Sequence, residues 1–504
     1  MSDNRAHMSD FAFFAVLAST VALVWIFPVF PTQDGPAHLE NARLLVELLR
    51  GNADVARFFS FDRFSPNWVS HLVLAPLLFV APAAVAEKIV LTIATVLVPL
   101  GFRKALRALG GPPALALLAL PFAHSFLLTM GFLNFCAAVG AALFVVARWS
   151  RPNSSTVGTA IGLTLTYFLH PVAFVYAAAM LVAMALVRGR AWWRPTALAI
   201  LPGIVLVFVF LGGHETTSTG GGPERWPLFA TLGVLVSFAP IEQTLSTFLW
   251  ILLGAVAVFE TCRLPWKRSW RDGLLLAAVP FLVLTFAAPF FLAGGAYLPE
   301  RFLLCGALTL ALWIGTRAPG ELLPPILGGV AASIAVAMNV ARVPALRERN
   351  DAIADYTSVA DALPPGTLVL PVNGSMSGER HDGSIGVTKV DSMRHAIGYL
   401  AISRGVIDLA NYQPNTGHFP LRWNDAATPF GRMFTQADLE QVPPPVDLLR
   451  YERETGIAVD AVLLWDLADR AKPEVARLYA DLDRGGYSEV ARSESGRTTV
   501  WTRR

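Results

Sequence analysis

The sequence is short of charged residues and of cysteine. Asp, Glu, Lys and Arg make up only 15% of its 504 residues, whereas ordinary soluble domains carry about 25%. The net charge of +3 is too small to indicate a nucleic-acid partner. Three cysteines, an odd number without the spacing of a zinc site, argue against a disulfide framework and are expected to pack as small apolar residues. The low fraction of charged residues excludes an ordinary soluble protein. No cofactor is predicted, and a need for a divalent cation is left open.

Hydrophobic residues, at 54% of the chain, gather in long uncharged runs. Several windows reach about 20 residues, enough to cross a hydrocarbon core about 30 Å thick. The first run, residues 11–30, is long for a secretory signal and lacks a small-residue cleavage site, so we expect a retained helix. We predict a mainly α, polytopic fold with about 11 to 13 transmembrane spans.

Basic residues mark the short segments between the apolar runs. They gather at 103–107, 148–151, 188–194 and 263–271, and loops rich in Lys and Arg stay in the cytoplasm. This pattern predicts a multi-pass protein of the inner (plasma) membrane, with a cytoplasmic N-terminus and an extracytoplasmic C-terminal domain. The order of the first crossings stays open, because two full crossings after residue 66 would place residues 103–107 outside.

Acidic residues divide the chain into two parts. Residues 1–345 hold 15 of the 37 Asp and Glu residues, and the shorter remainder holds the other 22. We therefore predict a transmembrane domain over 1–344 and a C-terminal domain over 345–504. In the C-terminal part, the apolar segments 364–372 and 460–467 are typical of buried strands. A small α/β domain is expected there, ending in a hairpin.

The stretch VFPTQDGPAHLENARLL, residues 29–45, opens the first outer loop at 31–66. Apolar residues recur in it at helical spacing, which predicts an amphipathic helix over 36–50 suited to the membrane surface. Asp34 precedes this helix. Its carboxylate either caps the helix, with Pro36 in the first turn, or lies desolvated at the edge of the hydrocarbon. In the second case a raised pKa would suit it to act as a general base.

A first helix, an acidic outer loop, a surface helix, many further spans and an outer domain together resemble the GT-C superfamily. These are integral-membrane glycosyltransferases that include protein O-mannosyltransferases and the lipid A aminoarabinose transferases. The segment QDGPAHLENA is similar to the first-loop motif of bacterial members with a single acidic residue. The segments GFLNFCAAVGAALF, YFLHPVAF and YLPERFLL resemble recurring helix motifs of that group. Gly35 follows Asp34 where many relatives carry a second acid, so no metal site is predicted.

The resemblance implies a reaction at the outer membrane face. The donor is a polyprenyl-phosphate sugar, the hydroxyl of a glycan, lipid or protein acceptor attacks its anomeric carbon with inversion, and the lipid phosphate leaves. Asp34 is the expected general base. Arg301 is expected to bind the donor phosphate, because a guanidinium can hold phosphate with two donors. The alternative for Arg301 is an interfacial anchor that snorkels to the headgroups.

Further site candidates lie at outer turns and in the C-terminal part. His170 is either a phosphate ligand or a buried hydrogen-bonded histidine, and Tyr297 either joins the phosphate site or belongs to an aromatic belt. His38 lies four residues after Asp34, on the same face of a helix that extends back to it. Acceptor-binding or supporting roles are expected for His38, Glu40, His395 and Arg404. For the last two, the alternative is a solvated or interdomain surface.

Two other functions stay open at this point. A transporter or flippase would favour an inverted repeat or a pair of broken helices, and neither is visible in the sequence. The other alternative is an inactive relative that binds glycan or lipid as an assembly factor. Only the presence of Asp34 separates the enzyme from that alternative.

Overall fold

The chain packs as two compact units. The first comprises Met1–Ile26 and Ile89–Val343, and the second comprises Phe27–Lys88 and Pro344–Arg504. The first outer loop therefore packs with the C-terminal segment in one unit. The predicted domain boundary at residue 344 divides the chain by sequence position alone. The computed structural model describes residues 2–62, 65–212, 233–263, 269–292, 295–317, 320–374, 390–467 and 473–503.

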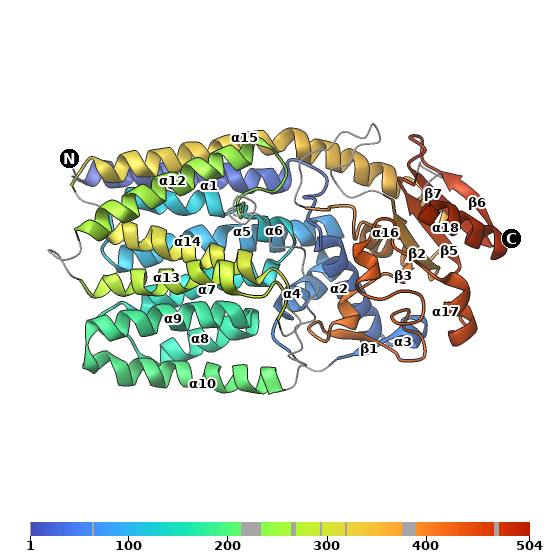
Figure 1. The fold of residues 1–504 in the computed structure, drawn as a ribbon, viewed down its shortest axis with the longest axis horizontal. Helices are drawn as coiled ribbons and strands as arrows, with labels where there is room; N and C mark the ends of the chain where they lie inside the picture. Colours follow the sequence, from blue (N-terminus) through green and yellow to red (C-terminus); the bar gives the residue numbers. More distant parts are fainter. Residues whose placement is uncertain are drawn as a thin grey trace. The chain divides into compact units, whose positions relative to one another are not determined.

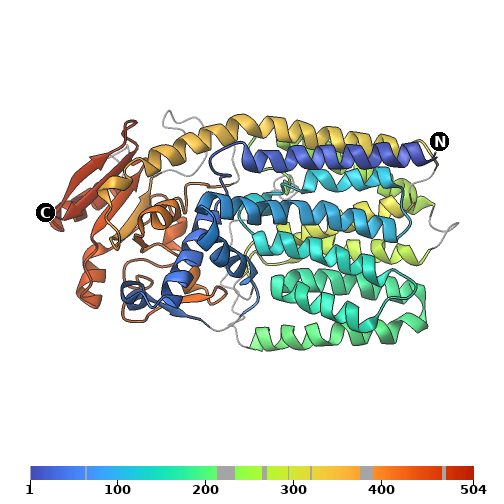
Figure 2. The same ribbon diagram turned by 180° about the vertical axis from the view of Figure 1, so that it is seen from behind.

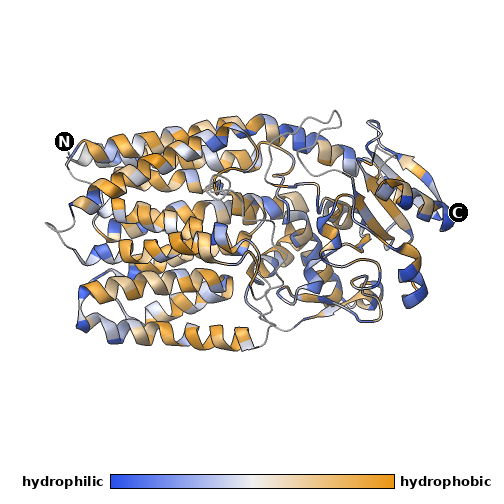
Figure 3. Ribbon diagram, in the orientation of Figure 1, coloured by the Kyte–Doolittle hydropathy of each residue, from blue (hydrophilic) through white to orange (hydrophobic). Residues whose placement is uncertain are grey.

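Apolar helices make up the first unit (Figures 1 and 2), and Figure 3 shows hydrophobic residues along their length. Two of them, α5 and α15, also reach into the second unit. The helices are α1 (Ser2–Trp25), α5 (Ala83–Ala108), η1 (Pro113–Phe122), α6 (Phe126–Thr129), α7 (Leu133–Trp149), α8 (Thr156–Leu169), α9 (Pro171–Arg188), η2 (Arg190–Trp192), α10 (Trp193–Gly212), α12 (Ile241–Cys262), η4 (Trp270–Asp272), α13 (Gly273–Ala287), α14 (Leu298–Arg317) and α15 (Leu323–Thr357).

Eight helices in the described residues are long and apolar enough to cross a membrane. This confirms the predicted mainly α, polytopic membrane fold, while the number of crossings stays a prediction. Four shorter apolar helices accompany them: Val69–Val80, Pro113–Phe122, Leu133–Trp149 and Thr156–Leu169. Among the eight, α14 is packed most deeply, since 89% of its apolar window is buried, against 22% for α12.

One apolar run does not form the single span that its length predicts. Residues 113–129 form the 3-10 helix η1 and then the short helix α6, which starts at Phe126. Pro113 and Pro121 remove backbone donors from this run, and proline inside a helix interrupts its hydrogen bonds. Composition alone therefore overestimates the regularity of this segment.

A buried ion pair ties α12 to α15 in the first unit. Glu242 Oε1 accepts from the guanidinium of Arg342, and Oε2 accepts from the backbone N–H groups of Ser237, Phe238 and Ala239 at 2.7–3.1 Å. A second guanidinium nitrogen of Arg342 donates to the carbonyl of Leu235 at 3.1 Å. Because buried charges are tolerated when they are paired and hydrogen-bonded, this pair anchors the backbone before α12.

The second unit contains a five-stranded sheet in the order β3-β2-β5-β7-β6. The central pair is parallel, with Val369 opposite Ala461, and β7 pairs antiparallel with both β5 and β6. These strands confirm the predicted small α/β domain. The strands are β2 (Leu368–Asn373), β3 (Ile407–Asp408), β5 (Ala461–Trp465), β6 (Tyr487–Arg492) and β7 (Thr498–Arg503), with helices α16 (Ile397–Arg404), α17 (Leu448–Thr455) and α18 (Pro473–Arg484).

The first outer loop packs into this unit instead of lying apart from it. It forms α2 (Gly35–Leu49), α3 (Ala53–Phe58) and β1 (Phe59–Phe61), and α4 (Val69–Val80) follows it in the same unit. Strand β1 pairs antiparallel with β4 (Leu421–Trp423), and α2 packs against α16 and α4 (Figures 1 and 2). The helix α2 is buried on its apolar face and on much of its polar face, since Glu40 and Asn41 are both covered.

Candidate functional site

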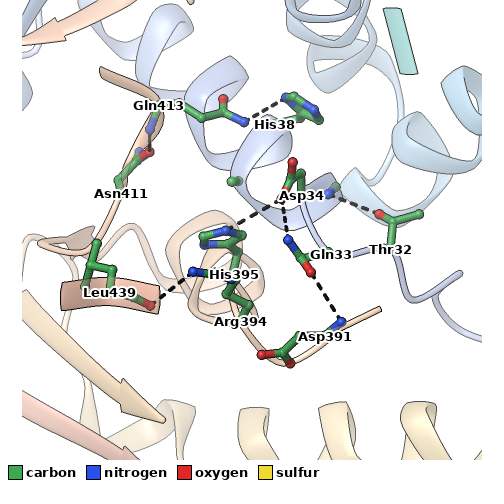
Figure 4. A network of polar contacts seen from close by, with 12 residues as sticks. Thr32, Gln33, Asp34, His38, Asp391, Arg394, His395, Asn411, Gln413 and Leu439 are labelled. Carbon is green, nitrogen blue, oxygen red and sulfur yellow. Dashed lines mark hydrogen bonds and ion pairs between the residues drawn. The ribbon is translucent and has the colours of Figure 1, made fainter. Parts of the chain in front are cut away.

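Asp34 precedes α2 but does not cap it. The side chain makes no capping hydrogen bond, and the hydroxyl of Thr32 accepts from the backbone N–H of Gly35 at 3.1 Å in its place. The interpretation of Asp34 as a helix cap is therefore wrong. The carboxylate is 6% exposed, and other polar groups of the second unit surround it (Figure 4).

Three side chains from the loop and the C-terminal segment face the Asp34 carboxylate. The amide of Gln33 donates to Oδ1 at 3.5 Å, and His395 Nε2 lies 3.6 Å from the same oxygen. The Tyr412 hydroxyl also hydrogen-bonds to Asp34. The rings of His395 and Tyr412 are stacked, with centroids 4.8 Å apart, so the two groups hold each other in place (Figure 4 shows His395 pointing at Asp34).

The electrostatics of this cluster suit a base. Burial raises the pKa of Asp34 to about 6, while the Tyr412 hydrogen bond and the charge of Arg394 act in the opposite direction. Arg394 is itself held by the carbonyl of Leu439 at 3.1 Å and by Glu440 at 2.7 Å. A carboxylate whose pKa lies close to the operating pH combines the ionised form with appreciable basicity.

His38 belongs to a neighbouring histidine pair. Its Nδ1 accepts from the Gln413 amide at 3.0 Å and lies 3.4 Å from His71 Nε2. His71 Nε2 in turn lies 3.2 Å from the Gln413 carbonyl oxygen, to which it donates. Gln413 thus fixes the orientation of both rings, and His38 is one turn along α2 from Asp34, whose carbonyl accepts from the His38 backbone N–H at 3.0 Å.

The other two supporting candidates have different surroundings. Glu40 accepts from the backbone N–H of Asp408 at 3.4 Å, and burial together with the Asp408 charge raises the pKa of Glu40. Arg404 forms an ion pair with the exposed Asp361 and donates to the carbonyl of Ala360. The structure therefore brings His395 to the Asp34 carboxylate and His38 to the neighbouring pair with His71, and it places Glu40 and Arg404 at other contacts.

A second cluster forms within the first unit. Arg301 lies in the first turn of α14 and is 6% exposed, which does not fit an anchor that snorkels to the headgroups. Its guanidinium lies over the rings of Phe132 and Phe135, 4.6 Å and 5.2 Å from the centroids. The ring of Tyr297, just before α14, packs edge-on against Phe290 at 4.7 Å. These contacts give Arg301 a fixed, largely apolar setting.

His170 lies in contact with Arg301. His170 is the N-cap of α9, and its Nδ1 accepts from the backbone N–H of Val172 at 3.2 Å. Its Nε2 lies 2.5 Å from Arg301 Nη1. This contact places the permanent charge of the Arg301 guanidinium beside the imidazole ring, and a guanidinium suits an anionic ligand.

The sequence pattern missed several of these residues. Tyr412 and Gln413 lie in a polar, aromatic segment that could only be described as a whole, and His71 lies in an apolar run. A histidine in such a run is a usable signal, because polar side chains in apolar segments are costly. In the described residues, no group of three or more His, Cys, Asp or Glu side chains could hold a metal ion.

Comparison with known proteins shows the fold. No family model and no curated protein matches the sequence. Two solved structures of ArnT from Cupriavidus metallidurans, one in the apo state and one bound to undecaprenyl phosphate, resemble the chain with a TM-score of 0.54. Each is 12% identical in sequence, and the alignment covers 97% of this chain and 97% of ArnT. The chain therefore shares the fold of ArnT, which confirms the predicted resemblance at the level of the fold.

Proposed function

We propose that the protein is an inverting glycosyltransferase of the inner membrane that uses a polyprenyl-phosphate sugar as donor. The observation that carries this proposal is the buried, non-capping carboxylate of Asp34, whose pKa is raised to about 6. The fold shared with ArnT, one structure of which holds undecaprenyl phosphate, supports a polyprenyl-phosphate partner. The acceptor is a hydroxyl group of a glycan, lipid or protein.

In the proposed reaction, Asp34 removes the proton of the acceptor hydroxyl. The acceptor oxygen forms a bond to the anomeric carbon, and the bond between that carbon and the lipid-phosphate oxygen breaks. The electron pair leaves with the phosphate, and the proton stays on Asp34 until solvent removes it. A single displacement inverts the anomeric configuration and needs one base but no carboxylate nucleophile.

Arg301 and His170 are the proposed phosphate ligands. The guanidinium of Arg301 can hold phosphate with two donors, and the imidazole of His170 lies against it within the first unit. Tyr297 supports the site by packing with the aromatic side chains before α14. His395 and Tyr412 hold the Asp34 carboxylate in position, and His38 with Gln413 is the proposed support for the start of α2.

The experiment compares wild type with Asp34→Asn, which keeps the shape of the side chain and removes the base. Both proteins, in nanodiscs, receive a panel of decaprenyl-phosphate pentoses and hexoses, and free decaprenyl phosphate is measured. The exposed Asp54→Asn serves as the matched control, because it makes the same change elsewhere in the second unit. We expect turnover in wild type and in the control, and a loss of about 10²–10⁴-fold in Asp34→Asn.

Equal turnover in wild type and Asp34→Asn would remove Asp34 from the chemistry. Binding of decaprenyl phosphate without turnover of any conjugate would favour the non-catalytic lipid-binding alternative, and absence of both would favour a transporter of another cargo.

A further inference from the structure

A second acidic side chain lies against the turn that carries Asp34. Glu87, in the second turn of α5, is 1% exposed. Neither of its carboxylate oxygens has a hydrogen-bond partner among the residues that the structure describes. The ammonium group of the adjacent Lys88 donates to the carbonyl of Phe27 at 2.5 Å. Buried polar groups in folded proteins nearly always have partners, so this carboxylate needs an explanation.

Gly35 brings the Glu87 carboxylate against the backbone next to Asp34. A Cβ atom at Gly35 would collide with the hydroxyl oxygen of Thr32 and with Oε1 of Glu87. Only a residue without a side chain allows this approach. The absence of a side chain at position 35 therefore leaves room for the carboxylate next to the Asp34 turn.

Tyr399 approaches the same turn from α16. A Cβ atom at Gly398 would collide with the carbonyl oxygen of Pro36, so α16 packs directly on the start of α2. The next residue, Tyr399, is 8% exposed, and its hydroxyl also has no hydrogen-bond partner in the described part of the chain. Burial and the charge of Glu87 raise the pKa of the Tyr399 hydroxyl, so the group keeps its proton and can both donate and accept.

We propose that Glu87 and Tyr399 bind the sugar of the donor through two adjacent hydroxyl groups. A carboxylate whose two oxygens have no partner among the described residues can accept from two O–H donors, and a vicinal diol presents two such donors. The Tyr399 hydroxyl completes the set as a donor or an acceptor. This inference rests on the proposed function, because it identifies the sugar of that reaction as the ligand.

The burial of both groups favours the donor sugar over the acceptor. A single sugar unit is small enough to be enclosed by side chains that are almost fully covered. An acceptor glycan or lipid extends beyond the reacting hydroxyl and needs a more open surface. The two polar groups flank the turn of Asp34, the proposed base, which is where the reacting sugar is required.

The test separates the sugar from the lipid phosphate. Wild type, Glu87→Gln, Tyr399→Phe and Glu47→Gln are prepared as full-length proteins in nanodiscs. Binding of decaprenyl phosphate is compared with binding of decaprenyl-phosphate arabinose, ribose, mannose and glucose. Glu47→Gln is the matched control, because it makes the same chemical change in an ion pair with Arg50 on the more exposed side of α2. Thermal unfolding confirms that all four proteins fold.

We expect wild type and Glu47→Gln to bind at least one sugar conjugate about tenfold more tightly than decaprenyl phosphate. Glu87→Gln and Tyr399→Phe are expected to lose most of this gain and to bind decaprenyl phosphate within twofold of wild type. A matching 2- or 3-deoxy conjugate should bind wild type as weakly as the unmodified conjugate binds Glu87→Gln.

Several outcomes would overturn the proposal. In the first, both variants keep the full increase in affinity that the sugar gives. In the second, wild type binds no sugar conjugate more tightly than decaprenyl phosphate. In the third, the variants lose affinity for decaprenyl phosphate to the same extent as for the conjugates. If only an amino-sugar conjugate bound more tightly than decaprenyl phosphate, and Glu87→Gln lost this increase in affinity, the ligand of Glu87 would be an ammonium group instead of a diol. Sugar binding that depends on Glu87 without any turnover would reject the transferase and leave the sugar site standing, so the two failures are distinguishable.

Discussion

The two units both bury carboxylates, and they surround them in opposite ways. In the first unit, Glu242 accepts from one guanidinium and three backbone N–H groups. In the second unit, Asp34 has only the long contacts to Gln33 and His395 and the Tyr412 hydroxyl, and the oxygens of Glu87 have no partner in the described residues. A fully satisfied carboxylate stabilises the fold, whereas a poorly satisfied one is available to a substrate.

Breaking the satisfied pair should have the largest effect on stability. Arg342→Met leaves Glu242 buried without its cation, and removal of one partner from a buried pair costs about 3–5 kcal/mol. We expect this loss in the free energy of unfolding, measured by thermal or denaturant unfolding in detergent. Arg347→Met, at an exposed position of the same helix, is the control. If Arg342→Met lowered the free energy of unfolding no more than Arg347→Met, the Glu242–Arg342 pair would not be a stabilising contact of the fold.

Asp34→Asn should change stability in the opposite direction. Because the folded protein raises the pKa of Asp34 to about 6, ionisation of this group destabilises the fold as pH rises from about 4 to about 6, and the penalty is complete above that window. The variant lacks this penalty, so it should be about 2–3 kcal/mol more stable than wild type at pH 7.5. The difference should vanish near pH 4. A destabilised variant at pH 7.5 would show that Asp34 is a structural group after all.

Arg301, in the first unit, is the proposed ligand of the donor phosphate. We expect Arg301→Gln to weaken binding of decaprenyl phosphate about 10- to 100-fold, since hydrogen bonds to a charged partner contribute about 1.5–3 kcal/mol. Arg301→Lys keeps the charge and should lose less. Equilibrium binding in nanodiscs measures the effect, with the exposed Arg194→Gln as control. Wild-type affinity in Arg301→Gln would exclude this phosphate site.

The smallest expected effect is that of Tyr412→Phe on the pKa of Asp34. The hydroxyl of Tyr412 stabilises the ionised form of Asp34 and so lowers its pKa. Its removal should raise the pKa by about one unit, the equivalent of about 1.4 kcal/mol. Because the base works in its ionised form, the acid limb of kcat/KM against pH should move from near pH 6 to near pH 7. If the limb stayed in place while activity fell at all pH values, Tyr412 would have only a packing role.

The sequence allowed the helical membrane fold, the C-terminal strands and Asp34 to be predicted, because each has a local signal. Apolar runs predict transmembrane spans, a Pro-Gly turn precedes the apolar strand β2, and Asp34 is a lone acid after the first span. The irregular segment 113–129 was missed because apolar composition does not distinguish an α-helix from a 3-10 helix.

The partners of Asp34 could not be predicted, because their signals are not local. Tyr412 and His395 are far from Asp34 in the sequence, and the tertiary packing of the second unit brings them together. Glu87 lies near the start of the apolar helix α5, and an acid in such a helix is a signal of function. Its approach to the Asp34 turn requires the lack of a side chain at Gly35, which no hydrophobic pattern reveals.

The composition of the second unit has a consequence for the order of biogenesis. Residues 27–88 leave the ribosome early, but their partners His395 and Tyr412 follow more than 300 residues after Lys88. At about 5–20 residues per second, this interval lasts about 15–60 s. During that time Asp34 and Glu87 exist without their enclosure. The cluster around Asp34 therefore forms only after the C-terminal segment has been synthesised and has folded onto residues 27–88.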